Sequence, residues 1–294
     1  MVQGKNKLFR ASFEQSKKIV KKEILTRDGA QIGISSSMSF WTRVSGLIAL
    51  AFSFIMYGVG IYLPDNMRES TKGVQVISES TGTLIGEIGL YLRPLILALV
   101  ILLSVIIILD IFPKINYAYQ LLYGNTFVVI SAIAMLVSSL PLTIGLTIGA
   151  FGVLAFMVQL LISVYLFKIM IVDQMNQFKN SIYNENEVES KDLGTPLMNF
   201  IKKYGGILLG LSVLNRWTFN FGEFSKENPG LMSFLSGWMF LLFIALLFFA
   251  EGLALKNFIK AFYFFKYRKE YREYFNITNE QWYGKFFARF MSKS

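Results

Sequence analysis

Cysteine and histidine are both absent from this chain of 294 residues. Without cysteine there is no disulfide framework, no lipid-modified cysteine and no thiolate nucleophile. Without histidine the chain lacks the most common general base and the most common ligand of metals and haem. The signatures of Walker loops, nucleophile elbows and zinc proteases are missing as well. We therefore expect no metal, no cofactor and no catalytic residues, and a protein that is not an enzyme.

Charge is scarce and unevenly placed. Charged residues make up 16% of the chain, whereas soluble domains carry about 25%. Between Phe127 and Phe167 there is no Asp, Glu, Lys or Arg over 41 residues. A bilayer core takes about 20 apolar residues per helix, so this stretch predicts two spans. The sequence therefore predicts a polytopic membrane protein.

Similar apolar runs recur along the chain and predict an all-α fold, a bundle of about six transmembrane helices. We place the turn of the central hairpin near SSLPLTIG, residues 138–145. The fifth run has a cleanly apolar core of only 11 residues, 204–214, followed by Asn215 and Arg216. A re-entrant segment there would leave five spans. The predicted spans are about 45–63, 90–111, 126–146, 148–172, 204–221 and 232–255.

Lysine and arginine orient the bundle, because short cytoplasmic loops carry an excess of both. Nine lie in residues 1–46, four in residues 173–203 and nine after Leu255. The predicted outer loops hold fewer, with two in residues 64–83 and one in residues 222–231. This pattern places both termini in the cytoplasm, which favours six spans over five, and we expect a bacterial plasma membrane.

Two basic segments flank the membrane domain of residues 45–255. Residues 1–44 form the cytoplasmic N-terminal segment, and within it residues 8–25 predict an amphipathic helix lying in the membrane interface. Residues 256–294 form a basic, aromatic cytoplasmic tail, in which residues 256–275 are expected to continue the sixth helix into the interface as a second interfacial helix. Basic flanks and anionic lipid account for the net charge of +10, so we expect no nucleic acid. The predicted anionic-lipid contacts are Lys17, Lys18, Lys21 and Lys22.

Three charged residues border the apolar runs on the predicted cytoplasmic side: Asp110, Lys168 and Glu251. At similar depth they form either a clamp between helices or the mouth of a polar pathway. Glu251 invites two interpretations of its own, because LLFIALLFFAEGLALKNF (241–258) has a single carboxylate. Either the span ends there, or the acid faces a cytoplasmic cavity, as acids within spans usually face an interior or water.

On the predicted outer side, Arg93 and Arg216 are either boundary anchors or cations lining an outward-facing crevice. Two GxxxG spacings allow helices to approach closely. These predicted packing positions are Gly145 with Gly149, and Gly206 with Gly210.

We expect an integral membrane transporter or permease subunit energised by a separate partner, by ATPase-coupled export or similar. Two alternatives remain in a second class, a non-catalytic subunit of an assembly or secretion complex and an immunity protein against a membrane-active toxin. The expected partners are a bilayer with anionic lipid and other membrane or ATPase subunits. Residues 112–125 and the polar, turn-rich loop 176–196 are the predicted docking segments.

Overall fold

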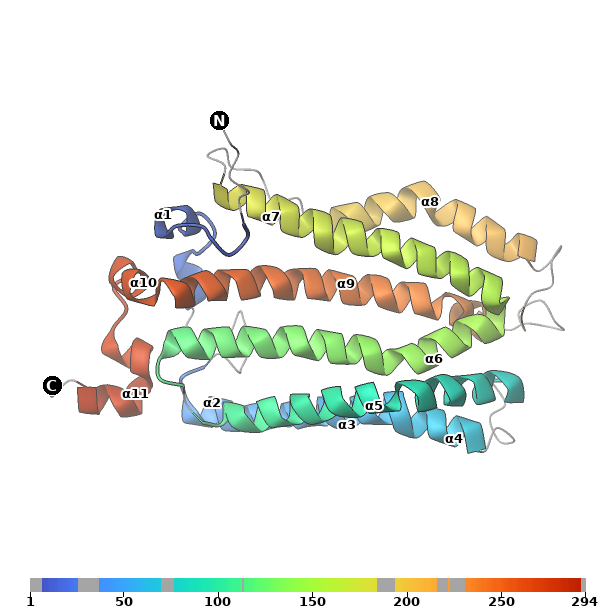
Figure 1. Ribbon diagram of the computed structural model, residues 1–294, viewed down its shortest axis with the longest axis horizontal. Helices are drawn as coiled ribbons and strands as arrows, with labels where there is room; N and C mark the ends of the chain where they lie inside the picture. Colours follow the sequence, from blue (N-terminus) through green and yellow to red (C-terminus); the bar gives the residue numbers. More distant parts are fainter. Residues whose placement is uncertain are drawn as a thin grey trace.

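The computed structural model describes residues 7–25, 37–69, 77–112, 114–183, 194–215, 222 and 231–291. Every regular element in these ranges is a helix, and the long helices lie side by side along the molecule (Figure 1). The elements are α1 (Phe13–Ser16), η1 (Lys22–Leu25), α2 (Phe40–Ser45), η3 (Gly46–Ala49), α3 (Leu50–Tyr57), η4 (Gly58–Tyr62), α4 (Leu63–Glu69), α5 (Glu79–Asp110), α6 (Tyr117–Phe167), η6 (Lys168–Val172), α7 (Asp173–Tyr183), α8 (Gly194–Leu214), α9 (Leu231–Lys266), α10 (Arg268–Tyr274) and α11 (Asn279–Met291).

Four helical runs in the described part of the chain are long and apolar enough to cross a membrane. Their outer faces expose large apolar side chains, such as Phe54 at 74% and Leu161 at 71%. Apolar surface of this extent is stable against lipid rather than water. The prediction of a helical membrane protein is therefore confirmed at the level of its class, with four candidate spans in the described residues. The runs are Phe40–Glu69, Glu79–Asp110, Tyr117–Tyr183 and Phe234–Lys266.

The third run, of 67 residues, is a hairpin of two arms. As a straight helix it would be about 100 Å long, more than three times the thickness of a bilayer core. Gly152, with φ of 84°, reverses the chain, and Figure 1 shows the return arm running antiparallel to the first, with α9 between the two arms. The turn predicted at residues 138–145 is wrong. Pro141 lies inside the helix, and nearby hydroxyls such as that of Thr143 bond to the backbone carbonyls around it.

The other helices extend beyond the predicted spans. α5 begins at Glu79, before the predicted start of its span near residue 90, and α9 continues past the predicted end of its span near residue 255 to Lys266. Helical hydrogen bonding does not stop at the lipid boundary, so a change from apolar to polar residues marks the end of a span and not of a helix. The same holds for the predicted loop 176–196, because α7 is helical as far as Tyr183; residues 184–193 lie outside the described residues.

The predicted fifth span corresponds to α8, a helix of 21 residues. By length and composition it is not among the four candidate spans of the described residues. Phe200 and Leu208 pack against a core formed by the return arm and α9. The end of the predicted span, residues 216–221, lies outside the described residues, and Arg216 with it.

Residues 8–25 do not form the predicted interfacial helix. α1 is a single turn closed by a capping box between Ser12 and Gln15, and η1 is a separate 3-10 turn. Val20 and Ile24 of this segment are buried in a core with the aromatic residues of α9 and α10, whereas Phe9 is 42% exposed. Because the protein covers most of this apolar face, the face is not free to enter the membrane.

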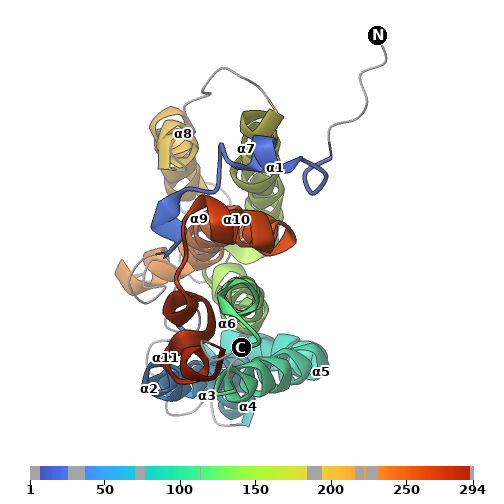
Figure 2. The same cartoon turned by 90° about the vertical axis from the view of Figure 1, so that its left-hand side faces the viewer.

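The N-terminal segment 7–25, α10 and α11 lie at one end of the molecule, where the segment packs against α10 (Figure 2). We call residues 7–25 and 259–291, which comprise the end of α9, α10 and α11, the terminal cap. Tyrosine hydroxyls hold it together: Tyr267 donates to the Ala11 carbonyl at 2.6 Å, and Tyr271 shares a bond of 2.7 Å with the Ser16 hydroxyl. Burial raises the pKa of Tyr271, so its hydroxyl stays neutral and keeps this bond.

Candidate functional site

Asp110 lies at the end of α5 in a buried polar cluster. Its Oδ1 accepts a hydrogen bond of 2.8 Å from Gln120 Nε2 near the start of α6. Arg43 of α2 is also buried here and donates from Nε to the Ile111 carbonyl at 3.3 Å. Lys114 completes the group; burial lowers its pKa, an effect that the charge of Asp110 partly offsets. These contacts join α2, α5 and α6 at one end of the bundle.

Glu251 and Lys168 lie elsewhere. Glu251 is 15 residues before the end of α9 at Lys266, about 22 Å along the helix, whereas Asp110 is the last residue of α5. Lys168 is exposed at the start of η6, within the return arm. The structure therefore places Asp110 with Gln120 and Arg43 rather than with the other two predicted members of the cluster. The expectation of equal depth assumed that all helices end at the lipid boundary.

A row of buried polar side chains lies where α9 packs between the two arms of α6. Gln159 Nε2 donates to the Gly237 carbonyl at 2.7 Å, and Thr147 Oγ1 accepts from the Phe240 amide at 3.2 Å. Thr143 and Ser163 lie one turn from Thr147 and Gln159 on the same helix faces and are also buried. We call Thr143, Thr147, Gln159 and Ser163, with the facing α9 backbone, the polar seam.

Only some of the polar atoms in and beside the polar seam have hydrogen-bond partners. Gln159 Oε1 and Trp238 Nε1 are buried without a hydrogen-bond partner among the described residues, and so is Glu251 Oε2 further along α9. A buried polar group without a partner costs about 1–3 kcal/mol, and surrounding lipid offers it no alternative. Among the described residues, Gln159 Oε1 therefore remains an unused acceptor in the seam, and Trp238 Nε1 remains an unused donor on α9.

Two ion pairs connect α4 and α5 at the opposite end from the terminal cap. Arg93 pairs with Asp65, and Arg68 pairs with Glu87 at 3.0 Å. The side chains of Arg93 and Asp65 are 36% and 35% exposed, so this pair lies at the surface of the helix contact. Of the two predicted outer cations, Arg93 is thus held by a carboxylate between two helices.

The two GxxxG spacings have different surroundings. A Cβ on Gly145 would lie 2.3 Å from Ile85 Cγ1, and one on Gly149 would lie 2.2 Å from Thr81 Oγ1, so these glycines let α5 approach α6 closely. A Cβ on Gly206 or Gly210 would meet nothing within 4 Å in the described part of the chain. The latter pair contacts no other described helix.

The predicted lipid-binding lysines lie on the terminal cap and are not gathered on one helix face. Lys17 pairs with Glu14 at 2.7 Å and lies over the rings of Phe13 and Tyr274. Lys17 is half-buried, whereas Lys18, Lys21 and Lys22 are exposed. Lipid contact by these residues stays a prediction.

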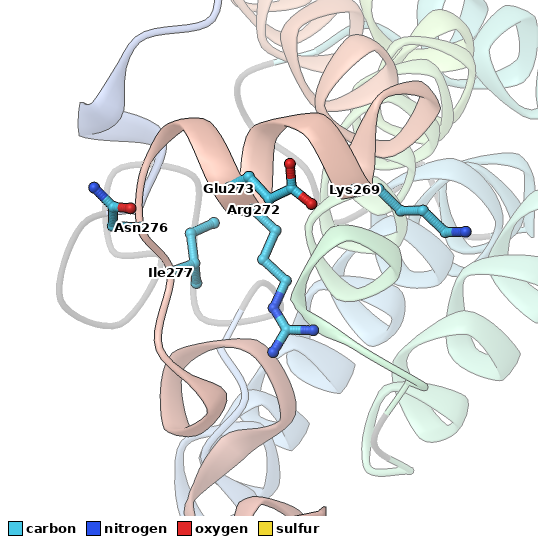
Figure 3. Close-up of a pocket in the computed structure, with 5 residues that line it drawn as sticks. All are labelled: Lys269, Arg272, Glu273, Asn276 and Ile277. Atoms are coloured by element: carbon cyan, nitrogen blue, oxygen red, sulfur yellow. The ribbon is translucent and has the colours of Figure 1, made fainter.

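A shallow hollow of about 490 Å³ lies on the terminal cap at the end of α10 (Figure 3). Asn276, with φ of 52°, ends the helix there, and the Arg272 guanidinium stacks 5.5 Å from the centre of the Trp282 ring. The hollow mixes cations with a carboxylate and lies away from the polar seam. No group of three Asp or Glu side chains in the described ranges is arranged to hold a metal ion. The residues lining the hollow are Lys269, Arg272, Glu273, Asn276 and Ile277.

The predicted docking segment 112–125 is largely covered by the chain itself. Tyr117 is buried and donates its hydroxyl to the Ile24 carbonyl at 2.6 Å, and Arg268 lies over the Tyr119 ring. Phe112 and Ile115 remain exposed, at 62% and 76%. At this end of the molecule the surface is therefore formed mainly by the terminal cap.

Sequence reasoning missed Arg43 and Gln159. Arg43 is one of the nine basic residues of the N-terminal segment, but its place at the beginning of an apolar run distinguishes it from the others. Gln159 is uncharged and lies in a stretch defined by its lack of charge; an amide inside a predicted span is the signal that points to it. No protein-family model, curated protein or solved structure matches this chain.

Proposed function

We propose that this protein is a membrane-embedded permease subunit that is energised by a separate partner. The polar seam is the observation that carries the proposal. Polar side chains inside a lipid-surrounded bundle are costly, and they mark either helix contacts or solute pathways. Thr147 and Gln159 bind the backbone of α9, whereas Gln159 Oε1 and Trp238 Nε1 have no partner in the described residues. Those free atoms favour a pathway between α9 and α6.

The proposed topology has six crossings, with α8 as the fifth and the two arms of α6 as the third and fourth. The hydrogen bonds that join the N-terminal segment to α10 support termini on the same side of the membrane. The excess of lysine and arginine at both ends supports a cytoplasmic location for them. A bacterial plasma membrane is part of this proposal.

The terminal cap is the proposed site of coupling to the energising partner. It is a hydrogen-bonded core that includes the last turns of α9, the helix that also lines the polar seam. Movement imposed on the cap by a cytoplasmic ATPase would therefore reach the seam through a continuous helix.

Purification of the full-length chain from its native membranes in mild detergent tests this function. We expect a stoichiometric ATPase to co-purify, and ATP hydrolysis by the reconstituted complex to fall when Gln159→Leu removes the amide of the seam. Leu161→Ala on the lipid-facing surface is the matched control, because Leu161 is 71% exposed. A chain that purifies alone, or a complex whose hydrolysis is unaffected by Gln159→Leu, would contradict the proposal.

One observation favours a second function, that of a non-catalytic subunit in a larger membrane assembly, which would also suit an immunity protein. The face of α8 that carries Gly206 and Gly210 is open, and neighbouring Ile207 and Leu211 are 61% and 51% exposed. Glycine faces of this type accept a partner helix. Co-purification of several membrane proteins without an ATPase would support this second function.

A further inference from the structure

Glu251 occupies a buried stripe of α9. Leu247, one turn before it, and Ala254, one turn after it, are 5% and 6% exposed. Residues at this spacing share one face of a helix. The carboxyl group is half-buried, and its Oε2 is fully enclosed with no hydrogen-bond partner in the described residues. An acid therefore lies on a face that the bundle otherwise fills with apolar side chains.

Two contacts place the part of α6 that lies level with Glu251. The Phe240 amide bonds to Thr147, and the Phe264 ring packs 5.9 Å from that of Tyr117. Because α9 and the first arm of α6 are antiparallel, counting from each contact places Glu251 level with about residues 130–136. That stretch, ISAIAML, is apolar apart from Ser131, whose hydroxyl donates to the Phe127 carbonyl at 2.8 Å.

No described charge neutralises Glu251 from the elements around it. Residues 127–167 of both arms contain no ionisable acid or base apart from Tyr165, and Lys168 of η6 is exposed. Lys256 of α9 donates to Gln174 Oε1 at 3.1 Å. The remaining charges on α9 and on α7 and α8, which pack against it, are half-buried or exposed. They are Asp173, Lys179, Lys202, Lys203, Lys260 and Lys266.

A carboxylate in such surroundings lacks both donors and counter-ions. An ionised carboxylate in an apolar medium is strongly unfavourable, and surrounding lipid makes the site less polar still. A metal cation would need several oxygen ligands, whereas a proton needs a single oxygen. We propose that Glu251 is a proton-binding site inside the membrane-spanning bundle, neutral in the packed state seen here.

Release of the proton then requires water to reach the carboxyl group. Water gains access when the helices packed around Glu251 separate, because their packing leaves Oε2 buried. The protonation state of Glu251 is thus linked to the packing of α9 against its neighbours. This link belongs to the chain itself and does not depend on whether an ATPase is the energising partner.

Dicyclohexylcarbodiimide tests the proposal on the full-length protein in liposomes, because this apolar reagent adds to protonated carboxyl groups within membranes. The O–H of the acid adds across one C=N bond, and rearrangement gives a stable N-acylurea without loss of atoms. Peptide mass spectrometry is expected to find the adduct on Glu251 at neutral pH, and the yield should fall as the pH is made alkaline. Glu251→Gln should remove the adduct, and Glu87→Gln, in an ion pair at the other end, should leave it unchanged.

Infrared spectroscopy provides a second measurement that does not depend on access of the reagent. The C=O stretch of a protonated carboxyl group should be present at neutral pH and missing from Glu251→Gln. An ionised Glu251 at neutral pH, or protection of Glu251 from the carbodiimide by Na⁺ at constant pH, would overturn the proposal.

Discussion

The contrast between Gly145 and Gly206 gives the sharpest test of the packing. Both glycines belong to GxxxG spacings, yet of the two only Gly145 lies against another helix in the described part of the chain. A Cβ added there would lie 2.3 Å from Ile85 Cγ1, 3.1 Å from Ile85 Cα and 3.3 Å from Ile85 Cβ. Rotation of the Ile85 side chain cannot relieve the contact with Cα, so Gly145→Ala must push α5 away from α6.

The expected cost follows from overpacking. Forcing an extra methyl group into a packed contact costs about 1–3 kcal/mol, and each 1.4 kcal/mol is a tenfold change in the unfolding equilibrium constant. At Gly206 an added Cβ meets no atom within 4 Å. Gly206→Ala should therefore be neutral or stabilise the helix by about 0.5–1 kcal/mol, because alanine is the better helix former.

Reversible unfolding of the purified protein in mixed detergent micelles measures both effects. The midpoint of the unfolding transition should fall for Gly145→Ala and should be unchanged or rise for Gly206→Ala. Equal changes in the two variants, or an unchanged midpoint for Gly145→Ala, would refute the close approach of α5 and α6.

Three further outcomes are expected. Replacing Arg93 with Gln should lower the free energy of unfolding by about 0.2–1 kcal/mol, since the pair is partly exposed, and a double-mutant cycle with Asp65→Asn should show the coupling decrease at high salt. Tyr271→Phe should cost about 0.5–1.5 kcal/mol and speed proteolysis of the N-terminal segment, whereas Tyr274→Phe, at a residue 53% exposed, should do neither. A reporter fused after Ser294 should be cytoplasmic, and an extracellular reporter would contradict six crossings.

The membrane class could be predicted because it depends on the hydropathy of a run of residues, which is a sum over the chain and needs no tertiary contacts. A run without charge from Phe127 to Phe167 is too long and apolar for anything but membrane helices. The position of the hairpin turn could not be predicted in the same way. Pro141 resembles a helix breaker, but hydroxyl groups and neighbouring helices compensate for its missing N–H within a bundle. Gly152, one of several glycines in this stretch, gave no sign that it alone adopts a positive φ.

The grouping of the charged residues depended on tertiary contacts that sequence does not contain. Asp110 and Glu251 both follow long apolar runs, which predicts equal depth if each helix ends there. α9 instead continues to Lys266 as part of the terminal cap, whereas α5 ends at Asp110. The interfacial helix predicted for residues 8–25 is wrong for a related reason. In a sequence, an apolar helix face has the same pattern whether lipid or aromatic side chains of the protein cover it.

Cysteine accessibility tests the central claim, that water reaches the polar seam, most directly. The natural chain contains no cysteine, so single replacements can be made without background. Ser163→Cys is nearly isosteric at a seam position 5% exposed, and Leu161→Cys, at a position 71% exposed to lipid, is the control. If the seam is a pathway, a water-soluble thiol reagent will modify Cys at position 163 in membranes and spare Cys at position 161. Failure to modify position 163, or equal modification of both, would contradict the account.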